Sequence, residues 1–326
     1  MALLEVRDLS VEFASHGRWL RAVDRVSFAI REGEILGLVG ESGSGKTVTC
    51  RALLRLLDGP NVRTPTGEVL FEGTDLLRLS ARELRRLHGR KIAMIFQNPS
   101  SYLDPLMTIG RQVAEPLIHH EGLRPREARG RAIELLRQVG IPDPGHNVDA
   151  YPHQLSGGMR QRAMIAAAVA CEPRLLVADE PTTALDVTVQ AQILRLLLEL
   201  RDRSGLSIVL ITHALGVVAA VCDSVAVMYA GRIMERASKR ELIREPKHPY
   251  TMGLIRSQPD LVAADEELPS IEGQLPALGE LPAGCRFHPR CPHALPACRR
   301  QTVELETAAG DHQVACIRWR ELEAAA

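Results

Sequence analysis

Short apolar runs that end in turn residues recur along the chain and predict strands. Apolar runs of this length are typical of strands buried in a sheet. They cover residues 3–13, 22–30, 34–40, 67–73, 91–97, 174–180, 206–213 and 224–235. Helical patterns lie between them, at residues 46–57, 126–139 and 190–201. Strands that alternate with helices predict an α/β fold with a largely parallel sheet covered on both faces, and a few antiparallel strands near the N-terminus.

The composition changes after about residue 258. The rest of the chain holds seven prolines, four glycines and only two aromatic residues, Phe287 and Trp319. Such a segment buries little apolar surface by itself. We therefore expect a small irregular C-terminal extension that needs an additional restraint to hold it together.

Charge and hydropathy narrow the classes of function. Forty basic and forty acidic residues give zero formal net charge, so the overall balance does not indicate a nucleic-acid partner. The longest uncharged apolar run, residues 163–171, is far shorter than the roughly 18 residues of a membrane span. The first residues also lack the pattern of a secretory signal. We expect a cytosolic or membrane-peripheral protein.

The sequence GESGSGKT at residues 40–47 is the strongest chemical motif. This G-x-x-x-x-G-K-[ST] pattern follows a predicted strand and opens a predicted helix, as a phosphate-binding loop (P-loop) does. Its glycines let backbone N–H groups wrap the phosphates, the Lys46 ammonium neutralises the β and γ groups, and the Thr47 hydroxyl ligates Mg²⁺. The alternative is a glycine-rich turn that only caps a helix. The motif consists of Gly40, Glu41, Ser42, Gly43, Ser44, Gly45, Lys46 and Thr47.

Two carboxylates follow the apolar strand pattern that begins at residue 174. Asp179 can hold Mg²⁺ through water while Glu180 polarises the attacking water, which is the division of labour that phosphoryl transfer requires. By itself, an acidic pair after a strand is usually a solvated strand end or a helix cap. The P-loop upstream favours the nucleotide function.

Four further motifs, in order along the chain, carry a family resemblance. Gln97 ends a predicted strand, LSGGMRQR spans residues 155–162, ALD spans residues 184–186, and His213 follows another predicted strand. With the P-loop and the acidic pair, these motifs resemble the ATPase subunits of ABC transporters over roughly residues 3–235.

The resemblance implies a fold and a domain plan. The fold is α/β, a P-loop NTPase of ABC type with a RecA-like core, an antiparallel β subdomain and a helical subdomain. The expected nucleotide-binding core comprises residues 1–97 and 161–235. The helical and signature subdomain comprises residues 98–160, and the C-terminal extension, with a metal site, residues 236–326.

The resemblance also assigns roles to residues. Glu180 is the expected base, with Gln97 and His213 reaching the γ-phosphate and its water. Ser156, Gly157 and Gly158, at a helix N-terminus, face the γ-phosphate held by a second ATPase subunit, so that two chains enclose two ATP molecules. Phe13 matches the aromatic residue that stacks on adenine, with core packing or Trp19 as alternatives. The expected nucleotide contacts are Phe13, residues 40–47, Gln97, Ser156, Gly157, Gly158, Asp179 and Asp186, and the expected magnesium ligands are Thr47, Gln97 and Asp179.

One position departs from the family pattern. Members of this type commonly have an aspartate after the switch histidine, where this chain has Ala214. Because the γ-phosphate contact of His213 does not need that aspartate, we expect activity to survive. The departure affects the expected hinge next to His213.

Three segments narrow the resemblance to oligopeptide and dipeptide importers. They lie at residues 97–117, 245–255 and 271–291. The implied function is ATP-driven import of di- or oligopeptides, with nickel complexes, glutathione or opine-like solutes as alternatives. A soluble ABC ATPase without a transport role is the rival of a different class.

The importer resemblance implies partners and a location. They are two integral-membrane permease subunits, a second ATPase subunit that is a paralogue or a second copy, and, indirectly, an extracytoplasmic peptide-binding protein. No nucleic acid is expected. The segment just after Gln97 would touch a cytoplasmic helix of a permease, and the chain would be peripheral on the cytoplasmic face of the membrane.

Four of the seven cysteines lie near the C-terminus, at Cys285, Cys291, Cys298 and Cys316. Four thiolates suit either Zn²⁺ or a [4Fe–4S] cluster, and spacing does not decide between them. The resemblance favours the [4Fe–4S] cluster, with zinc, free thiols or disulfides as alternatives, and we expect a structural or docking role. The remaining cysteines, Cys50, Cys171 and Cys222, are expected in the core. The histidines His288, His293 and His312 lie among the expected ligands and could replace one, but with four cysteines present we expect them at the surface.

Overall fold

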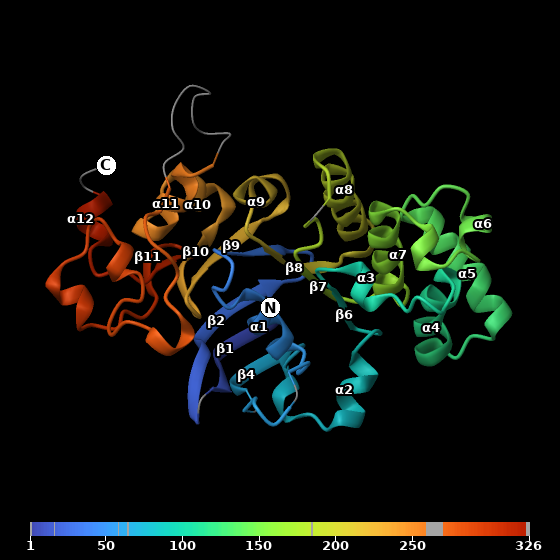
Figure 1. Cartoon of the computed structure of the whole chain (residues 1–326), viewed down its shortest axis with the longest axis horizontal. Helices are drawn as coiled ribbons and strands as arrows, with labels where there is room; N and C mark the ends of the chain where they lie inside the picture. Colours follow the sequence, from blue (N-terminus) through green and yellow to red (C-terminus); the bar gives the residue numbers. More distant parts are fainter. Residues whose placement is uncertain are drawn as a thin grey trace. The chain divides into compact units, whose positions relative to one another are not determined.

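The computed structural model describes residues 2–15, 17–57, 59–63, 65–183, 185–258 and 270–323. The chain divides into two compact units (Figure 1). The first contains residues 1–78 and 211–326, and the second contains residues 79–210. The chain crosses from the second unit to the first inside strand β8 (Ser207–Thr212). The domain boundaries expected from the sequence stay a prediction.

An antiparallel sheet forms the N-terminal part of the first unit. Its strand order is β2-β1-β4-β5. The two longest strands pair along most of their length, with Val6 opposite Phe28 and Phe13 opposite Leu20. Val6, Leu9 and Phe28 are buried, so one face of this sheet supplies core. The strands are β1 (Ala2–Ser15), β2 (Arg18–Arg31), β4 (Thr66–Phe71) and β5 (Thr74–Asp75).

A second set of strands in the first unit runs in the order β11-β12-β10-β9-β3. Strand β3 (Ile35–Val39) is parallel to β9 (Ser224–Tyr229), and both are fully buried. Strand β10 (Arg232–Ser238) returns antiparallel to β9 through a turn at Ala230 and Gly231. Both turn residues have positive φ, 46° and 82°, as a two-residue type I′ hairpin requires. The single apolar run at residues 224–235 is therefore two strands.

The C-terminal extension continues this sheet. Strand β12 (His312–Val314) pairs antiparallel with β10, and β11 (Glu306–Ala309) pairs with β12. Figure 1 shows this part of the chain, in orange and red, gathered beside β9 and β10. The extension is thus built onto the sheet of the first unit.

Short helices complete the first unit. Helix α1 ends at Leu53, earlier than the expected residue 57, because Arg55 adopts a left-handed φ of 50°. The α-helices are α1 (Lys46–Leu53), α9 (Leu215–Val221), α10 (Lys239–Arg244), α11 (Pro249–Arg256) and α12 (Trp319–Glu323). Single 3-10 turns are η1 (Leu76–Arg78), η4 (Leu278–Glu280), η5 (His288–Arg290) and η6 (Pro296–Arg299).

The second unit combines two parallel strands with a helical bundle. Strand β6 (Ile92–Ile95) is parallel to β7 (Leu175–Asp179), which lies between β6 and β8. Helices α4, α5 and α7 pack on one another, and Figure 1 shows them as a green group. Each of them buries an apolar side chain: Val113, Leu136 and Ile165. The helices are α2 (Ala81–Leu87), α3 (Pro99–Tyr102), α4 (Ile109–Glu121), α5 (Pro125–Gln138), α6 (Pro144–Asn147), η2 (Pro152–Gln154), α7 (Gly157–Val169) and α8 (Val187–Ser204).

Helices α5 and α8 confirm two of the three predicted helical patterns to within a few residues. Across the part of the chain that the structure describes, every helix is too short or too polar to span a bilayer.

Candidate active site

The P-loop joins the buried strand β3 to helix α1. Gly40 and Gly45 have φ angles of 150° and 103°, which residues other than glycine rarely adopt. A Cβ atom at Gly40 would lie 2.1 Å from the carbonyl oxygen of Met228, on the neighbouring strand β9. The loop therefore lies directly against the sheet, and these two positions require glycine.

The Lys46 ammonium lies inside the curve of this loop. Its Nζ is 2.8 Å from the carbonyl oxygens of both Gly40 and Glu41 and 3.4 Å from the Ser44 hydroxyl. The residue is only 4% exposed. A cation held there would offset the charge of phosphates wrapped by the loop N–H groups, which is the role expected from the sequence. Thr47 follows in the first turn of α1.

The C-terminal extension also reaches the P-loop, which sequence reasoning missed. The Glu41 N–H donates to the hydroxyl of Tyr250 in α11 over 3.0 Å. The Glu41 carboxylate accepts from Arg290 at the end of η5. A tyrosine and an arginine about 210 and 250 positions away along the chain give no local pattern that would link them to the P-loop.

The aromatic candidates for adenine stacking and His213 belong to the same unit as the P-loop. Phe13 is half-buried on β1, and Trp19 on β2 is 39% exposed and stacks with the Arg63 guanidinium, 4.3 Å from the ring centroid. Both aromatic rings stay candidates for adenine. His213 is exposed just after β8. Ala214 gives α9 no side-chain cap, and its N–H donates to the Thr212 hydroxyl instead.

The expected acid–base residues lie in the second unit, at the ends of β6 and β7. Ile95 and Ala178 are partners in the parallel register, and Gln97 and Glu180 each lie two positions farther along. The Gln97 amide donates to Glu180 Oε2 over 2.9 Å. The Thr183 hydroxyl donates to the same oxygen over 2.8 Å. The structure thus brings together two residues that the sequence assigned to one reaction.

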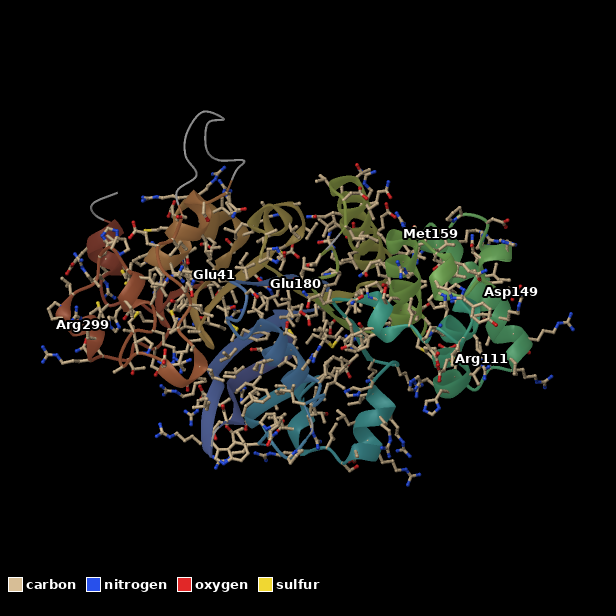
Figure 2. All side chains as sticks on the ribbon, viewed as in Figure 1. Glu41, Arg111, Asp149, Met159, Glu180 and Arg299 are labelled. Atoms are coloured by element: carbon tan, nitrogen blue, oxygen red, sulfur yellow. The ribbon has the colours of Figure 1, made fainter. Side chains whose placement is uncertain are left out.

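Asp179 and Glu180 have different surroundings. Asp179 is the last residue of β7 and only 1% exposed. Glu180 is half-buried and has a φ of 45°. A residue other than glycine keeps such a backbone angle only where the surrounding structure holds it there. Figure 2 shows the labelled Glu180 side chain. A buried carboxylate beside a more accessible one fits the expected roles of metal holder and base.

The motif at residues 155–162, called the signature in this family, opens helix α7 in the same unit. The Ser156 hydroxyl accepts from the Met159 N–H over 3.3 Å, so Ser156 is the cap of the helix, and Gly157 and Gly158 follow. A Cβ at Gly158 would lie 2.9 Å from Val189 of α8, so glycine permits this close packing. The exposed N-terminus of a 13-residue helix is a site suited to anions.

Asp186 caps helix α8, where its carboxylate accepts from the Val189 N–H over 2.9 Å. Ala184 of the same motif lies outside the described residues. The Arg160 guanidinium in α7 donates to the Ser100 hydroxyl in α3 over 2.8 Å. This hydrogen bond joins the signature helix to the segment that follows Gln97.

The four cysteines of the extension line a single cavity. Cys285, Cys291, Cys298 and Cys316 share it with Phe287. Burial raises the pKa of Cys291 to about 11 and that of Cys316 to about 12. Without a metal these two thiols are protonated at neutral pH. Among the described residues, no group of three or more His, Cys, Asp or Glu side chains is arranged to hold a metal ion.

The other three cysteines are buried, as expected of core residues. Cys50 and Cys222 are completely buried and Cys171 nearly so. Burial raises the pKa of Cys171 to about 11 and that of Cys222 to about 12. All seven cysteines are free of disulfides.

The expectation that His312 lies at the surface is wrong. His312 is 2% exposed on β12, and its Nε2 is 2.7 Å from a carboxylate oxygen of the completely buried Glu235 on β10. Glu235 also accepts from the N–H groups of Lys247 and His248, over 2.7 and 2.9 Å. His312 is buried because it gives this carboxylate a polar partner where β12 joins the sheet.

Two protein families match the sequence. The family described as ABC transporter matches residues 23–183. The family described as the C-terminal region of oligopeptide/dipeptide transporters matches residues 234–298, which include three of the four clustered cysteines.

Curated relatives match over nearly their whole length. The dipeptide transport ATP-binding protein DppD of Haemophilus influenzae is 49% identical over 316 residues, which cover 97% of this chain and 95% of that protein. The protein of the same name from Escherichia coli K12 is 48% identical, with 97% and 96% covered.

Solved structures match about three quarters of the chain. The dimeric ATP-binding cassette MJ0796, in a post-hydrolysis state bound to ADP and Pi, is 29% identical with a TM-score of 0.65 and covers 73% of this chain and 99% of its own. The protein cbiO1 of Clostridium perfringens, part of the ABC transporter complex cbiONQ, is 27% identical with a TM-score of 0.63, covering 75% and 91%.

Proposed function

The chain belongs to the ATP-binding proteins of ABC transporters, and from this premise we propose that it hydrolyses ATP to power the import of di- or oligopeptides. The peptide assignment rests on relatives named for dipeptide transport, about half identical over nearly the whole chain, and on the match of residues 234–298 to the peptide-transporter C-terminal region. The observation that carries the ATPase function is the glycine loop that holds Lys46 within its curve.

Each site residue has a chemical task in this function. The P-loop N–H groups and the Lys46 ammonium would bind the phosphates, and Phe13 or Trp19 would stack on adenine. Mg²⁺ would offset phosphate charge when bound, and the oxygen ligands it prefers are present in the Thr47 hydroxyl, the Gln97 amide and the Asp179 carboxylate.

Glu180 would accept the proton of the attacking water. The Gln97 amide, 2.9 Å from its carboxylate, would hold that carboxylate in position. His213 would contact the γ-phosphate. Glu180 and Gln97 together supply a base and the group that positions it.

The assembly that we propose has two ATPase subunits on two membrane permeases, at the cytoplasmic face of the membrane. Ser156, Gly157 and Gly158 would face the nucleotide of the second ATPase subunit, a paralogue or a second copy. In the segment just after Gln97, which would contact a permease, Leu106 is 84% exposed and Tyr102 is 46% exposed. The Arg160–Ser100 hydrogen bond would link that segment to the signature helix. An extracytoplasmic peptide-binding protein would deliver the solute.

We also propose that Cys285, Cys291, Cys298 and Cys316 hold a [4Fe–4S] cluster, with zinc as the alternative. The donor set fits, because four thiols line one cavity. Four thiols suit a cluster or a zinc ion equally well, so the preference for the cluster rests on the family resemblance. Its role would be structural, as a clip for the proline-rich extension.

The transport function can be tested on the intact membrane complex. The tagged full-length chain is purified with its membrane subunits, reconstituted into vesicles with the binding protein, and assayed for ATP hydrolysis with and without dipeptide. We expect dipeptide to stimulate hydrolysis and Lys46→Met to abolish it. Lys239→Met, at the start of α10, is the control and should retain stimulation.

The alternatives give different results in the same experiment. Stimulation by nickel complexes, glutathione or opine-like solutes, but not by dipeptides, would change the substrate class. Recovery of an active ATPase without permease subunits would favour the soluble ABC ATPase instead.

The cysteine proposal needs a metal analysis of anaerobically purified chain. We expect iron and sulfide in equal amounts and an absorbance band in the visible range. The Cys285→Ser variant should lose the iron, the sulfide and the band. Cys171→Ser, outside the cavity, should keep them. Stoichiometric zinc without iron would establish the alternative.

A further inference from the structure

The C-terminal extension touches the P-loop at three points. The Glu41 N–H donates to the Tyr250 hydroxyl, and the Glu41 carboxylate accepts from Arg290. A Cβ atom at Gly43 would lie 3.3 Å from the Leu275 side chain, so this leucine packs directly on the loop. The phosphate-binding segment is therefore supported from outside the cassette core by the part of the chain that carries the cysteines.

Hydrogen bonds to a carboxylate and to two backbone carbonyls fix the Arg290 guanidinium in place. One guanidinium nitrogen, Nη1, lies 3.0 Å from each carboxylate oxygen of Glu41. The other two donate to backbone carbonyls, Nε to Glu272 over 2.9 Å and Nη2 to Ile271 over 3.1 Å. The Arg290 side chain is only 7% exposed. A guanidinium fixed by carbonyls on one side presents its charge to Glu41 in one geometry.

Because Glu41 lies in the P-loop, its ion pair with Arg290 affects how the loop binds nucleotide. Glu41 is the second residue of the P-loop, and its carbonyl oxygen accepts from the Lys46 ammonium over 2.8 Å. An unpaired carboxylate on the loop would repel a triphosphate and would leave the loop freer to move. Arg290 offsets that charge, while Tyr250 and Arg290 together fix the backbone and side chain of Glu41.

We propose that Arg290 of the C-terminal extension is a positioning residue for ATP: it neutralises Glu41 and holds the P-loop in its phosphate-binding shape. Arg290 ends η5 and directly precedes Cys291. The fold of the extension, through this one side chain, thus sets the nucleotide affinity of the cassette.

The test is a double-mutant cycle in which ATP affinity is measured for the full-length chain with Mg²⁺. Arg290→Met, which removes the charge but keeps much of the volume, should weaken ATP binding about tenfold. Glu41→Gln removes the carboxylate that Arg290 neutralises. The double variant should therefore bind ATP more tightly than Arg290→Met alone, and the defect of Arg290→Met should shrink as ionic strength rises.

A matched control lies in the same extension. Arg299 directly follows Cys298, is exposed, and Figure 2 shows it away from Glu41. Arg299→Met should bind ATP as the parent chain does. Arg290→Lys, which keeps the charge but loses the fork that engages the two carbonyls, should fall between the parent and Arg290→Met.

A structural role alone predicts a different pattern. It would lower the thermal midpoint of Arg290→Met without any recovery of affinity in the double variant, and that result would overturn the proposal. Parental affinity in Arg290→Met would also overturn it. If Arg290→Met does not fold, Tyr250→Phe tests the second contact without a change of charge, and unchanged ATP affinity there would count against the proposal.

Discussion

The Gln97 amide donates a hydrogen bond to one carboxylate oxygen of Glu180 over 2.9 Å. The contact follows from the parallel register of β6 and β7, because both residues lie two positions beyond a registered pair. The Thr183 hydroxyl donates to the same oxygen, so that oxygen has two donors. The proposed base is therefore oriented by neutral groups, and changes at Gln97 should alter how it works.

The first prediction concerns the pH dependence of hydrolysis in Gln97→Glu. Two carboxylates at hydrogen-bond distance do not both stay ionised, so one of them retains a proton to higher pH. The acid limb of the pH–rate profile should move upward by about one pH unit. Gln97→Met, which loses the hydrogen bond but adds no charge, should lower the rate without that displacement. Superimposable profiles for Gln97→Glu and the parent would contradict the contact.

The second prediction separates binding from chemistry at Glu180. Glu180→Gln keeps the shape and the ability to accept a hydrogen bond, but it removes the group that would take the proton. The kcat for ATP should fall at least about 100-fold, while ATP binding stays near that of the parent. Single-turnover hydrolysis and equilibrium ATP binding measure the two effects separately.

A control for Glu180 is available on helix α8 of the same unit. Glu199 is exposed there, and Glu199→Gln should hydrolyse ATP at the parental rate. Parental turnover in Glu180→Gln itself would remove Glu180 from the role of base.

The third prediction concerns the acid stability of the first unit. Asp24 is 4% exposed and accepts from Arg232 over 2.7 Å and from Arg286 over 2.6 Å. Burial alone would raise the pKa of Asp24, but hydrogen bonds and charge from Arg232, together with the charge of Arg286, hold it below its usual value. The stability from this ionised group is complete above about pH 3.9 and is lost as the pH falls through the lower folded-state pKa.

Asp24→Asn should show the size of this contribution near neutral pH. It leaves Arg232 and Arg286 without their shared anion, and we expect the free energy of unfolding to fall by about 3 kcal/mol. Denaturant unfolding followed between pH 3 and pH 7 measures both effects. Glu5→Gln, which removes an exposed pair with Arg7, is the control and should change the unfolding midpoint little.

The fourth prediction concerns Glu235, which holds the extension to the core sheet. In Glu235→Gln an amide NH₂ replaces one of two oxygens that accept from N–H groups, so at least one donor faces another donor. The free energy of unfolding should fall by about 2 kcal/mol. Hydrogen exchange should accelerate at the amides of Lys247 and His248. Glu280→Gln, exposed in η4, should leave both amides as slow as in the parent.

Much of the cassette could be predicted from the sequence because its determinants are local. The P-loop needs glycine at Gly40 and Gly45 and lysine at the start of a helix, and these needs appear as one contiguous pattern. The buried strands appear as apolar runs for the same reason. That Gln97 and Glu180 lie near each other could be predicted, since both follow parallel strands. The register that brings them into hydrogen-bond contact could not.

The contacts of the extension could not be predicted, because they join residues that are distant in sequence. Arg290 lies among prolines and cysteines, and only the folded chain brings it to Glu41. Strand β12 has three residues, too few for a periodic signal, so no pattern in the sequence indicates that His312 is buried. The early end of α1 depends on the backbone angle of Arg55, which composition does not reveal.

The pairing of β12 with β10 bears on how shortened forms of this protein will behave. A chain cut at about residue 258 would expose the edge of β10, with its N–H and C=O groups open to another molecule. Such a chain should self-associate through that edge even if its cassette folds. Poor solubility after truncation would then report an unpaired strand, and full-length chains with single substitutions are the sounder way to study the cysteines.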